Sequence, residues 1–257
     1  MVIENSIKGF IDTHIHTAPD SKPRILNDIE AAYEAKKEGM HAIFIKSHIE
    51  STAGRSKIAQ EVTGLNVIGG VCLNLSVGGL NPNAVKAAAE LGGKIIWFPT
   101  ISANKINVCF ENTEDILNII AEKELILATG HLKVNDIFSL LDYAKSMHIK
   151  KILINHPLTR VVGASIDEQK EMARYALLEH CFVACMEMHD NLDPNVLAEA
   201  IKEVGPKNCI MATDFGQSHN PTPVEGIKLF VYYMKKNGIN NSDIDKMCME
   251  NPSKLLL

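Results

Sequence analysis

The stretch Phe10-Ile11-Asp12-Thr13-His14-Ile15-His16, close to the start of the 257-residue sequence, alternates apolar and polar side chains. This alternation predicts a short β-strand, and its period of two places His14 and His16 on the same face. Two imidazoles about 6 to 7 Å apart along one strand can hold a single divalent metal ion. An isolated His-x-His also fits two structural histidines, so the interpretation depends on the rest of the chain.

Segments typical of strands and helices alternate along the sequence. The short run 41–48 is mostly apolar, as expected for a buried parallel strand, and the helix-like segment before it stops at Gly39. Asn81-Pro82 and Asp193-Pro194 each place a capping side chain before a proline, which marks a helix start. Further strands are expected at 67–73, 94–99, 125–129, 151–155, 182–186 and 209–213, and helices at 27–37, 56–63, 82–91, 113–123, 134–147, 165–179, 194–204 and 224–236.

Eight strands, spaced roughly 25 to 31 residues apart and each followed by a helix, predict an α/β fold. We expect a single (β/α)8 TIM barrel, a closed parallel eight-stranded barrel with outer helices, over residues 1–257. The competing architecture is an open doubly wound sheet, but no GxGxxG fingerprint follows the first strand. The eight units leave no residues for a second domain, and the tail 242–257 is expected to close the barrel from outside.

Composition limits the classes of function. Hydrophobic residues make up 46% of the sequence, and the formal net charge of −5 provides no basic field for nucleic acid. No apolar run reaches transmembrane length, the first residues lack the apolar core of a signal peptide, and the six cysteines form no CxxC pair. We therefore expect a cytoplasmic protein that acts on a small molecule, with no nucleic-acid or membrane partner.

Histidines and one aspartate gather where predicted strands end. The carboxyl ends of the strands form the face on which barrel enzymes build their active sites. His41, His148 and His180 lie elsewhere and are expected to be solvated, whereas His189 and His219 lie in loops from which they could reach the site. The residues at strand ends are His14, His16, His48, His131, His156 and Asp214.

The order of His14, His16, His131, His156 and Asp214 along the chain resembles the pattern of the amidohydrolase superfamily of metal-dependent barrel enzymes. Its pattern is His-x-His on strand one, His after strands five and six, and Asp after strand eight. The ending 250–256, Glu-Asn-Pro-Ser-Lys-Leu-Leu, is similar to the Asn-Pro-x-x-x-Leu ending of many members. More narrowly, Asn81-Pro82-x-Ala84-Val85 with Trp97-Phe98-Pro99-Thr100 resembles a small branch whose reaction is unassigned. The resemblance covers essentially the whole chain.

The resemblance implies a divalent metal ion, with Zn²⁺ expected first and Mn²⁺ or Fe²⁺ as alternatives. Its ligands would be His14, His16 and His131, with Asp214 as a further ligand. Members with two ions usually carry a lysine or glutamate at the end of strand four, where this chain reads Ile96-Trp97-Phe98-Pro99-Thr100. One ion is therefore favoured over two, and the candidates for holding a second are His156, His48, Glu187, Glu50 and Cys72.

The same resemblance implies catalytic roles for Asp214 and His156. Asp214 would accept a proton from a metal-activated water and pass it to the leaving group. His156 would polarise the substrate carbonyl or stabilise the oxyanion, unless it ligates a second ion. The expected function is metal-dependent hydrolysis of an amide, cyclic amide, lactone or phosphoester of a small anionic metabolite.

Four cations lie near the predicted mouth of the barrel. Two or more of them converging would suit a carboxylate or phosphate, although ordinary surface charge is the alternative for each. Lys46 shares a strand face with His48. The candidate substrate-binding residues are Lys46, Arg24, Arg55 and Arg160.

Two alternative functions use the same residues. A metal-dependent non-oxidative decarboxylase or other C–C lyase of the same superfamily needs one ion and no ligand from strand four. A non-catalytic barrel that binds metal or a metabolite is the third possibility. Apolar outer helices also make a homo-oligomer a candidate assembly.

Overall fold

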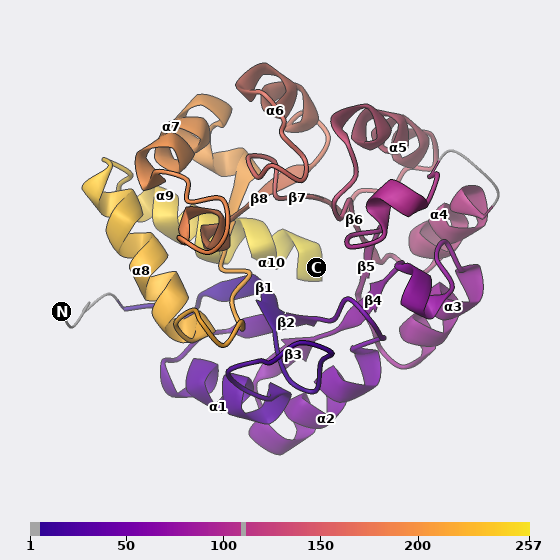
Figure 1. Cartoon of the computed structure of the whole chain (residues 1–257), viewed down its shortest axis with the longest axis horizontal. Helices are drawn as coiled ribbons and strands as arrows, with labels where there is room; N and C mark the ends of the chain where they lie inside the picture. The colour runs from indigo at the N-terminus through magenta and orange to yellow at the C-terminus, as the bar shows by residue number, and fades with distance from the viewer. Residues whose placement is uncertain (1–5, 109–111) are drawn as a thin grey trace.

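Strands surrounded by a ring of helices form the centre of the structure, a computed structural model that describes residues 6–108 and 112–257 (Figure 1). The strands are β1 (Ile11–His16), β2 (Ala42–Lys46), β3 (Asn66–Ile68), β4 (Gly70–Cys72), β5 (Ile95–Trp97), β6 (Ile126–Ala128), β7 (Ile152–Asn155), β8 (Leu177–Cys181) and β9 (Cys209–Ala212). The helices are α1 (Asp28–Lys37), α2 (Ala53–Thr63), α3 (Pro82–Glu90), α4 (Thr113–Glu122), α5 (Val134–Ser146), α6 (Ile166–Met172), α7 (Pro194–Val204), α8 (Pro223–Lys236), α9 (Asn241–Asp245) and α10 (Asn251–Leu256).

All paired strands run parallel, in the orders β1-β2-β3 and β4-β5-β6-β7-β8-β9. Gly69 alone separates β3 from β4, so these two segments continue one path and the described residues supply eight barrel strands. The residues that follow β9 lie against β1, where Asp214 N donates to His14 O at 2.8 Å and His16 N donates to Phe215 O at 2.7 Å. The predicted (β/α)8 barrel is confirmed as the fold class.

Side chains of alternate strand residues separate into two apolar clusters, as a period of two requires. The larger cluster lies between the strands and the helices, and the smaller cluster takes Ile11, Phe44 and Trp97 from the strands. Leu255 of α10 joins the smaller cluster, and Figure 1 shows α10 across the middle of the ring. The tail therefore covers one end of the barrel interior instead of packing only on the outside.

The seventh barrel strand lies earlier in the sequence than expected. Helix α6 ends at Met172, Leu177–Cys181 forms β8, and Phe182–Cys185 is a 3-10 helix, so the predicted strand 182–186 and the predicted helix 165–179 are both wrong in their bounds. Leucine and glutamate favour helix locally, but parallel pairing with β7 and β9 overrides that preference. The shift brings Glu179 into the barrel.

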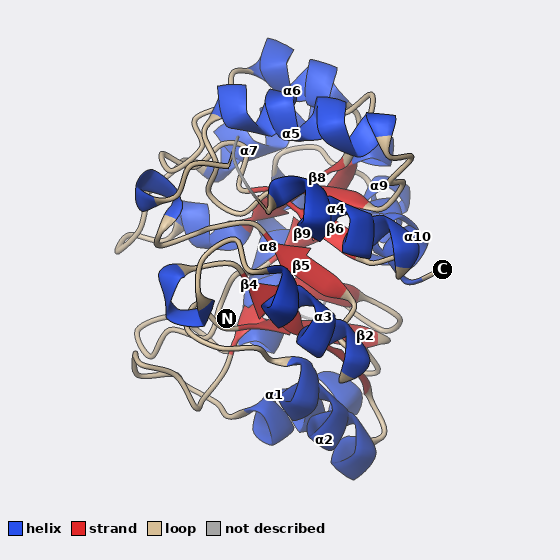
Figure 2. Ribbon diagram, turned by 90° about the vertical axis from the view of Figure 1, so that its right-hand side faces the viewer, coloured by secondary structure: helices blue, strands red, loops and turns tan. Residues whose placement is uncertain are grey.

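Several helix starts follow the sequence signals. Asn81 caps α3 by accepting hydrogen bonds from Asn83 N and Ala84 N, and Asp193 caps α7 by accepting from Asn195 N. Figure 2 shows the helices on the outside of the strands. Within the described ranges, none of the helices has both the length and the apolar character needed to cross a membrane. Cys109 lies outside the described residues, and the other five cysteines are unpaired thiols.

Candidate active site

Five histidine rings form a continuous cluster at the carboxyl ends of the strands. β1 presents His14 and His16 on one face with their ring centroids 5.4 Å apart. The His14 ring lies 5.0 Å from that of His156, and the His16 ring lies 4.7 Å from that of His48. His131 completes the cluster at 5.2 Å from His156 and 6.2 Å from His48. Residues far apart in the sequence therefore meet where the strand ends converge.

Asp214 joins three of these histidines. Its Oδ1 lies 3.0 Å from His16 Nε2 and 3.3 Å from His14 Nε2, and its Oδ2 lies 3.5 Å from His156 Nε2. Burial would raise the pKa of this carboxyl, but the neighbouring histidines hold it well below its ordinary value. Asp214 and His156 both adopt positive φ angles, 54° and 53°, a conformation that non-glycine residues retain only where the surrounding structure fixes it.

The donor atoms fit a divalent metal ion. Ligand atoms of His14, His16 and Asp214 all lie within 4.8 Å of one another. Burial lowers the pKa of His16 to about 4 and that of His156 to about 3, so both rings are neutral at pH 7 and can offer a lone pair. Among the described residues, the buried Nδ1 atoms of both rings have no hydrogen-bond partner. Two imidazoles and a carboxylate are suitable ligands for Zn²⁺, Mn²⁺ or Fe²⁺.

Glu179 orients His14 from the opposite side of the ring. This fully buried carboxylate lies 2.9 Å from His14 Nδ1 and accepts hydrogen bonds from Thr13 Oγ1 at 2.5 Å and Asn155 Nδ2 at 2.7 Å. Burial would raise the pKa of Glu179, but His14 and the hydrogen bond from Thr13 keep it lowered. A hydrogen bond from Nδ1–H to this carboxylate would leave the Nε2 lone pair for a metal ion on the side of Asp214. Sequence reasoning missed Glu179 because its segment was predicted to be helical.

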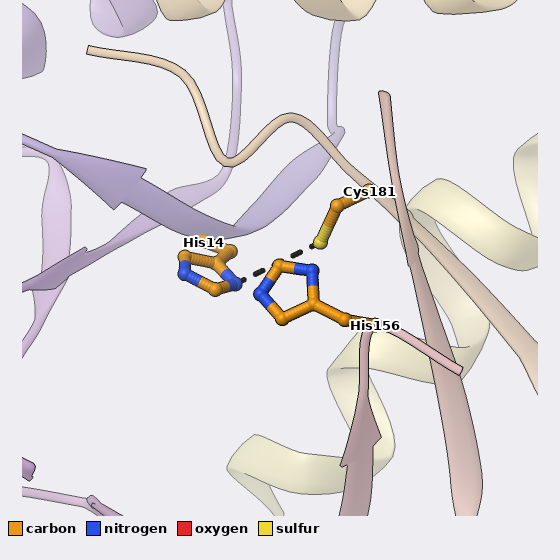
Figure 3. A group of neighbouring side chains, drawn as sticks. All are labelled: His14, His156 and Cys181. Atoms are coloured by element: carbon orange, nitrogen blue, oxygen red, sulfur yellow. Dashed lines mark hydrogen bonds between the residues drawn. The ribbon is translucent and has the colours of Figure 1, made fainter. Parts of the chain in front are cut away.

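A second group of possible ligands contains a thiol. Figure 3 shows His14, His156 and Cys181 pointing toward one another, and their ligand atoms also lie within 4.8 Å. The Cys181 Sγ lies 3.7 Å from His14 Nδ1, the nitrogen that Glu179 already engages. Burial raises the pKa of Cys181 well above its usual value, which keeps it a thiol at neutral pH. The set with His16 and Asp214 is therefore the better metal site.

His131 and His48 lie at the edge of this set. His131 is half-buried, and burial lowers its pKa well below the ordinary value. His48 Nδ1 lies 2.8 Å from Thr100 Oγ1, and burial lowers its pKa strongly. The Cys72 Sγ also lies 3.3 Å from Thr100 Oγ1. In the described part of the chain, neither histidine belongs to a set of residues whose ligand atoms all lie within 4.8 Å of one another. Their roles as metal ligands therefore stay predictions.

Neither predicted acidic ligand for a second ion belongs to the candidate metal groups of the described residues. Glu50 pairs with Arg55, and Glu187 is exposed. Glu187 follows the 3-10 helix Phe182–Cys185 and not a strand, because β8 ends at Cys181. The glutamate on the seventh barrel strand is therefore Glu179 and not Glu187.

The four predicted cations divide into two kinds. Arg24 pairs with Asp20 at 2.8 Å, Arg55 pairs with Asp28 at 2.8 Å, and Arg160, with 80% of its side chain exposed, lies 3.8 Å from Asp190. Each arginine is thus engaged by a carboxylate of this chain. Lys46 differs, because it is buried with its Nζ 3.2 Å from His14 Nε2.

The other histidines are only partly as expected. His41 and His148 are exposed, but His180 is 1% exposed and its two ring nitrogens have no partner among the described residues. The prediction that His180 is solvated is wrong, because β8 takes the place of the expected connection and packs this ring into the protein. His189 Nε2 lies 3.3 Å from His219 Nε2.

A cavity of about 170 Å³ opens beside the cluster. Its apolar lining includes Val183, and its polar lining comes from His131, His156, Thr159, His189, Asp190 and Asp214. Because Asp214 and His156 face both the cavity and the candidate metal ligands, a small molecule bound here would meet both groups.

Known proteins match this chain at the levels of family and fold. A model described as "Family of unknown function (DUF6282)" matches residues 9–179. No sequence among the curated proteins matches.

The fold is similar to solved structures of amidohydrolase-type barrels. An amidohydrolase from Pseudomonas aeruginosa is 14% identical, with coverage of 98% of this chain and 96% of that chain and a TM-score of 0.67. A probable 2-pyrone-4,6-dicarboxylic acid hydrolase from Acinetobacter baumannii, solved with citric acid bound, is 13% identical, with coverage of 96% and 98% and a TM-score of 0.67. The phosphotriesterase homology protein from Escherichia coli, complexed with phosphate, is 12% identical, with coverage of 97% and 99% and a TM-score of 0.61. The resemblance to the amidohydrolase superfamily is confirmed for the fold.

Proposed function

The chain belongs to DUF6282, a family of unknown function, and we propose that it is a metal-dependent hydrolase. The observation that carries this proposal is the meeting of His14, His16, His156 and Asp214 at the carboxyl ends of the strands. The names of the similar structures, an amidohydrolase, a pyrone dicarboxylate hydrolase and a phosphotriesterase homologue, support hydrolysis as the reaction class.

His14, His16 and Asp214 would hold the ion. A bound Zn²⁺, Mn²⁺ or Fe²⁺ would supply a water with a pKa lowered toward about 7. Asp214 is an ionised carboxylate at neutral pH, because the surrounding histidines lower its pKa. It would take the proton of the attacking water at one carboxylate oxygen and return it to the leaving group.

His156 would act on the substrate. Its Nε2 lies 3.5 Å from Asp214 Oδ2, and its ring lines the cavity. Burial keeps the ring neutral at pH 7. A neutral ring can donate one N–H to a substrate oxygen on which negative charge develops, which is the requirement for carbonyl or phosphoryl attack. Suitable substrates are an amide, cyclic amide, lactone or phosphoester of a small anionic metabolite.

One ion is favoured over two. The end of the fourth barrel strand carries Trp97, which packs in the barrel interior, and Thr100, which contacts His48. No carboxylate occupies the bridging position there. The lyase alternative needs the same single ion and the same catalytic residues, Asp214 and His156. Analysis of the products therefore has to distinguish carbon dioxide release from hydrolysis.

The test measures turnover of a panel of lactones, cyclic amides and phosphodiesters by the metal-reconstituted protein. Proton release in weak buffer reports each hydrolysis. We expect hydrolysis of at least one class and its loss in Asp214→Asn, because an amide cannot accept the water proton. Lys207→Gln, at a position remote from the cluster, serves as the control. Carbon dioxide release from carboxylated substrates without hydrolysis would identify the lyase instead, and no turnover with any substrate class would contradict an enzymatic function.

A further inference from the structure

A second cavity, of about 330 Å³, lies at the opposite end of the barrel from the candidate active site. The residues that line it include His41, Lys94 and Lys151, which immediately precede strands β2, β5 and β7. Because the strands run parallel, their amino ends lie together at one end of the barrel, whereas the histidine cluster lies at their carboxyl ends. This cavity is therefore separate from the site described above.

Lysines dominate the charged lining of this cavity. Three lysines line it together with one glutamate, namely Lys94, Lys123, Lys151 and Glu124. Lys123 also pairs with Glu122 at 2.9 Å, but among the described residues no carboxylate lies within ion-pair distance of the other two ammonium groups. The whole chain has more acidic than basic residues, 31 against 26, so composition does not account for this local excess of positive charge. Cations gathered around one cavity repel one another and attract an anion into it.

Part of the lining is apolar. It includes Ile68 of β3 and both Leu255 and Leu256 of α10, the helix that crosses the middle of the ring (Figure 1). Leu255 belongs to the smaller apolar cluster of the barrel, and the other two residues pack against that cluster. An apolar chain on a ligand would extend this cluster and leave water. A ligand that carries both a charge and an apolar chain would therefore use more of the cavity than an inorganic anion would.

We propose that this cavity binds a small amphipathic anion, with a carboxylate or phosphate group toward Lys94 and Lys151 and an apolar chain against Leu255 and Leu256. A lysine ammonium attracts either anionic group as a point charge, so the two groups share one chemistry of recognition. The inference goes beyond the proposed hydrolase function and does not depend on a metal ion. Because α10 forms part of the cavity, a bound anion would also hold this helix on the barrel and raise the stability of the fold.

The experiment is isothermal titration calorimetry of the full chain, freed of metal by chelation, with four probes. Hexanoate and hexyl phosphate carry both parts of the ligand, inorganic phosphate carries the charge alone, and hexanol carries the apolar chain alone. The variants are Lys94→Gln, Lys151→Gln and the double variant, which remove positive charge from the cavity. Lys57→Gln is the matched control, because Lys57 is an exposed lysine of α2 that does not line the cavity. A second readout is the rise in melting temperature that each probe causes.

We expect hexanoate or hexyl phosphate to bind the native chain and Lys57→Gln equally, and more tightly than inorganic phosphate or hexanol. The double variant should bind the same probe about tenfold or more weakly, because it loses two charge-assisted contacts with the anion. Preference for one of the two amphipathic probes identifies the anionic group as carboxylate or phosphate. His16→Ala should bind this probe as the native chain does, because His16 lies at the other end of the barrel.

Three results would overturn the inference. They are absence of binding by both amphipathic probes, equal affinities of the native chain and the double variant, and inorganic phosphate binding as tightly as hexyl phosphate. Each of these leaves the proposed hydrolase function intact, because the titrations contain no metal ion and measure no turnover.

Discussion

At the scale of single residues, Glu179 determines which nitrogen of His14 faces the site. Its carboxylate contacts Nδ1 of His14 and is itself held by Thr13 and Asn155. A carboxylate behind a metal-binding imidazole fixes the tautomer and raises the basicity of the coordinating nitrogen. The geometry of the metal site thus depends on a residue that would not touch the metal.

Replacement of Glu179 by glutamine should therefore weaken metal binding by roughly 10- to 100-fold, because the neutral amide no longer favours the required His14 tautomer. Chelator competition measures the loss. Glu187→Gln is the matched control, since Glu187 is an exposed glutamate from the same region and was the residue expected near strand seven. Equal affinities for native chain and Glu179→Gln would show that the carboxylate plays no part in the metal site.

His180 makes stability depend on pH. Burial lowers the pKa of this ring from its ordinary value of 6.5 to about 4, and nearby Glu179 only partly opposes the effect. The unfolded chain binds a proton more readily than the folded chain, so the stability linked to His180 is fully present above pH 6.5 and is lost as the pH falls toward 4. The linked loss amounts to about 3 kcal/mol.

Urea unfolding at pH 7 and pH 4.5 measures this effect. Between pH 7 and pH 4.5, the free energy of unfolding of His180→Leu should fall by about 2 to 3 kcal/mol less than that of the native chain, because the leucine side chain binds no proton. If the two proteins lose the same free energy of unfolding, His180 is not the group that titrates.

The identity of His14, His16, His156 and Asp214 as candidate site residues follows from the sequence, because strand ends on one barrel face must meet. The role of Glu179 does not follow in the same way. Its importance lies in a contact between β8 and β1, and that contact depends on strand register and side-chain direction, which a single sequence does not specify.

At the scale of elements, the turn after β9 connects the last barrel strand to the first barrel strand, β1. Gly216 has φ of +132°, and a Cβ there would lie only 1.8 Å from the carbonyl oxygen of His16. The turn also carries Asp214, so close packing of Gly216 on β1 places this carboxylate beside both β1 histidines.

A methyl group at Gly216 should consequently displace the turn. We expect Gly216→Ala to lower the free energy of unfolding by about 3 kcal/mol or more, because both backbone strain and a clash with backbone atoms contribute. Gly54→Ala in α2 is the control, since nothing lies within 4 Å of the added methyl there, and it should raise stability by up to about 1 kcal/mol. Denaturant unfolding of both variants compares them directly, and equal stabilities would refute the close-packing argument.

The segment of β8 shows why one element was misplaced from the sequence. Its residues, Leu-Leu-Glu-His-Cys, include two polar side chains that are both buried, so neither alternation nor a continuous apolar run marks the strand. Capped helices such as α3 and α7 were easier to predict, because their start signals are local. An element held mainly by its neighbours has no comparable local signal.

At the scale of the whole molecule, the site joins strands from both ends of the sequence. β1 supplies His14 and His16, and the turn after β9 supplies Asp214, almost 200 residues later. An ion held between them would link the first and last barrel strands. Metal binding should therefore stabilise the fold as well as enable chemistry, by the linkage between ligand binding and unfolding.

The most direct test of the metal-dependent site is the metal content per chain, measured by plasma mass spectrometry after chelation and reconstitution with Zn²⁺, Mn²⁺ or Fe²⁺. The native chain should retain about one equivalent, and His16→Ala should lose it, because a site with one fewer imidazole is incomplete. His41→Ala, at an exposed histidine outside the cluster, should retain the metal. A native chain that stays metal-free after reconstitution, or a His16→Ala variant that keeps its full content, would contradict the proposal.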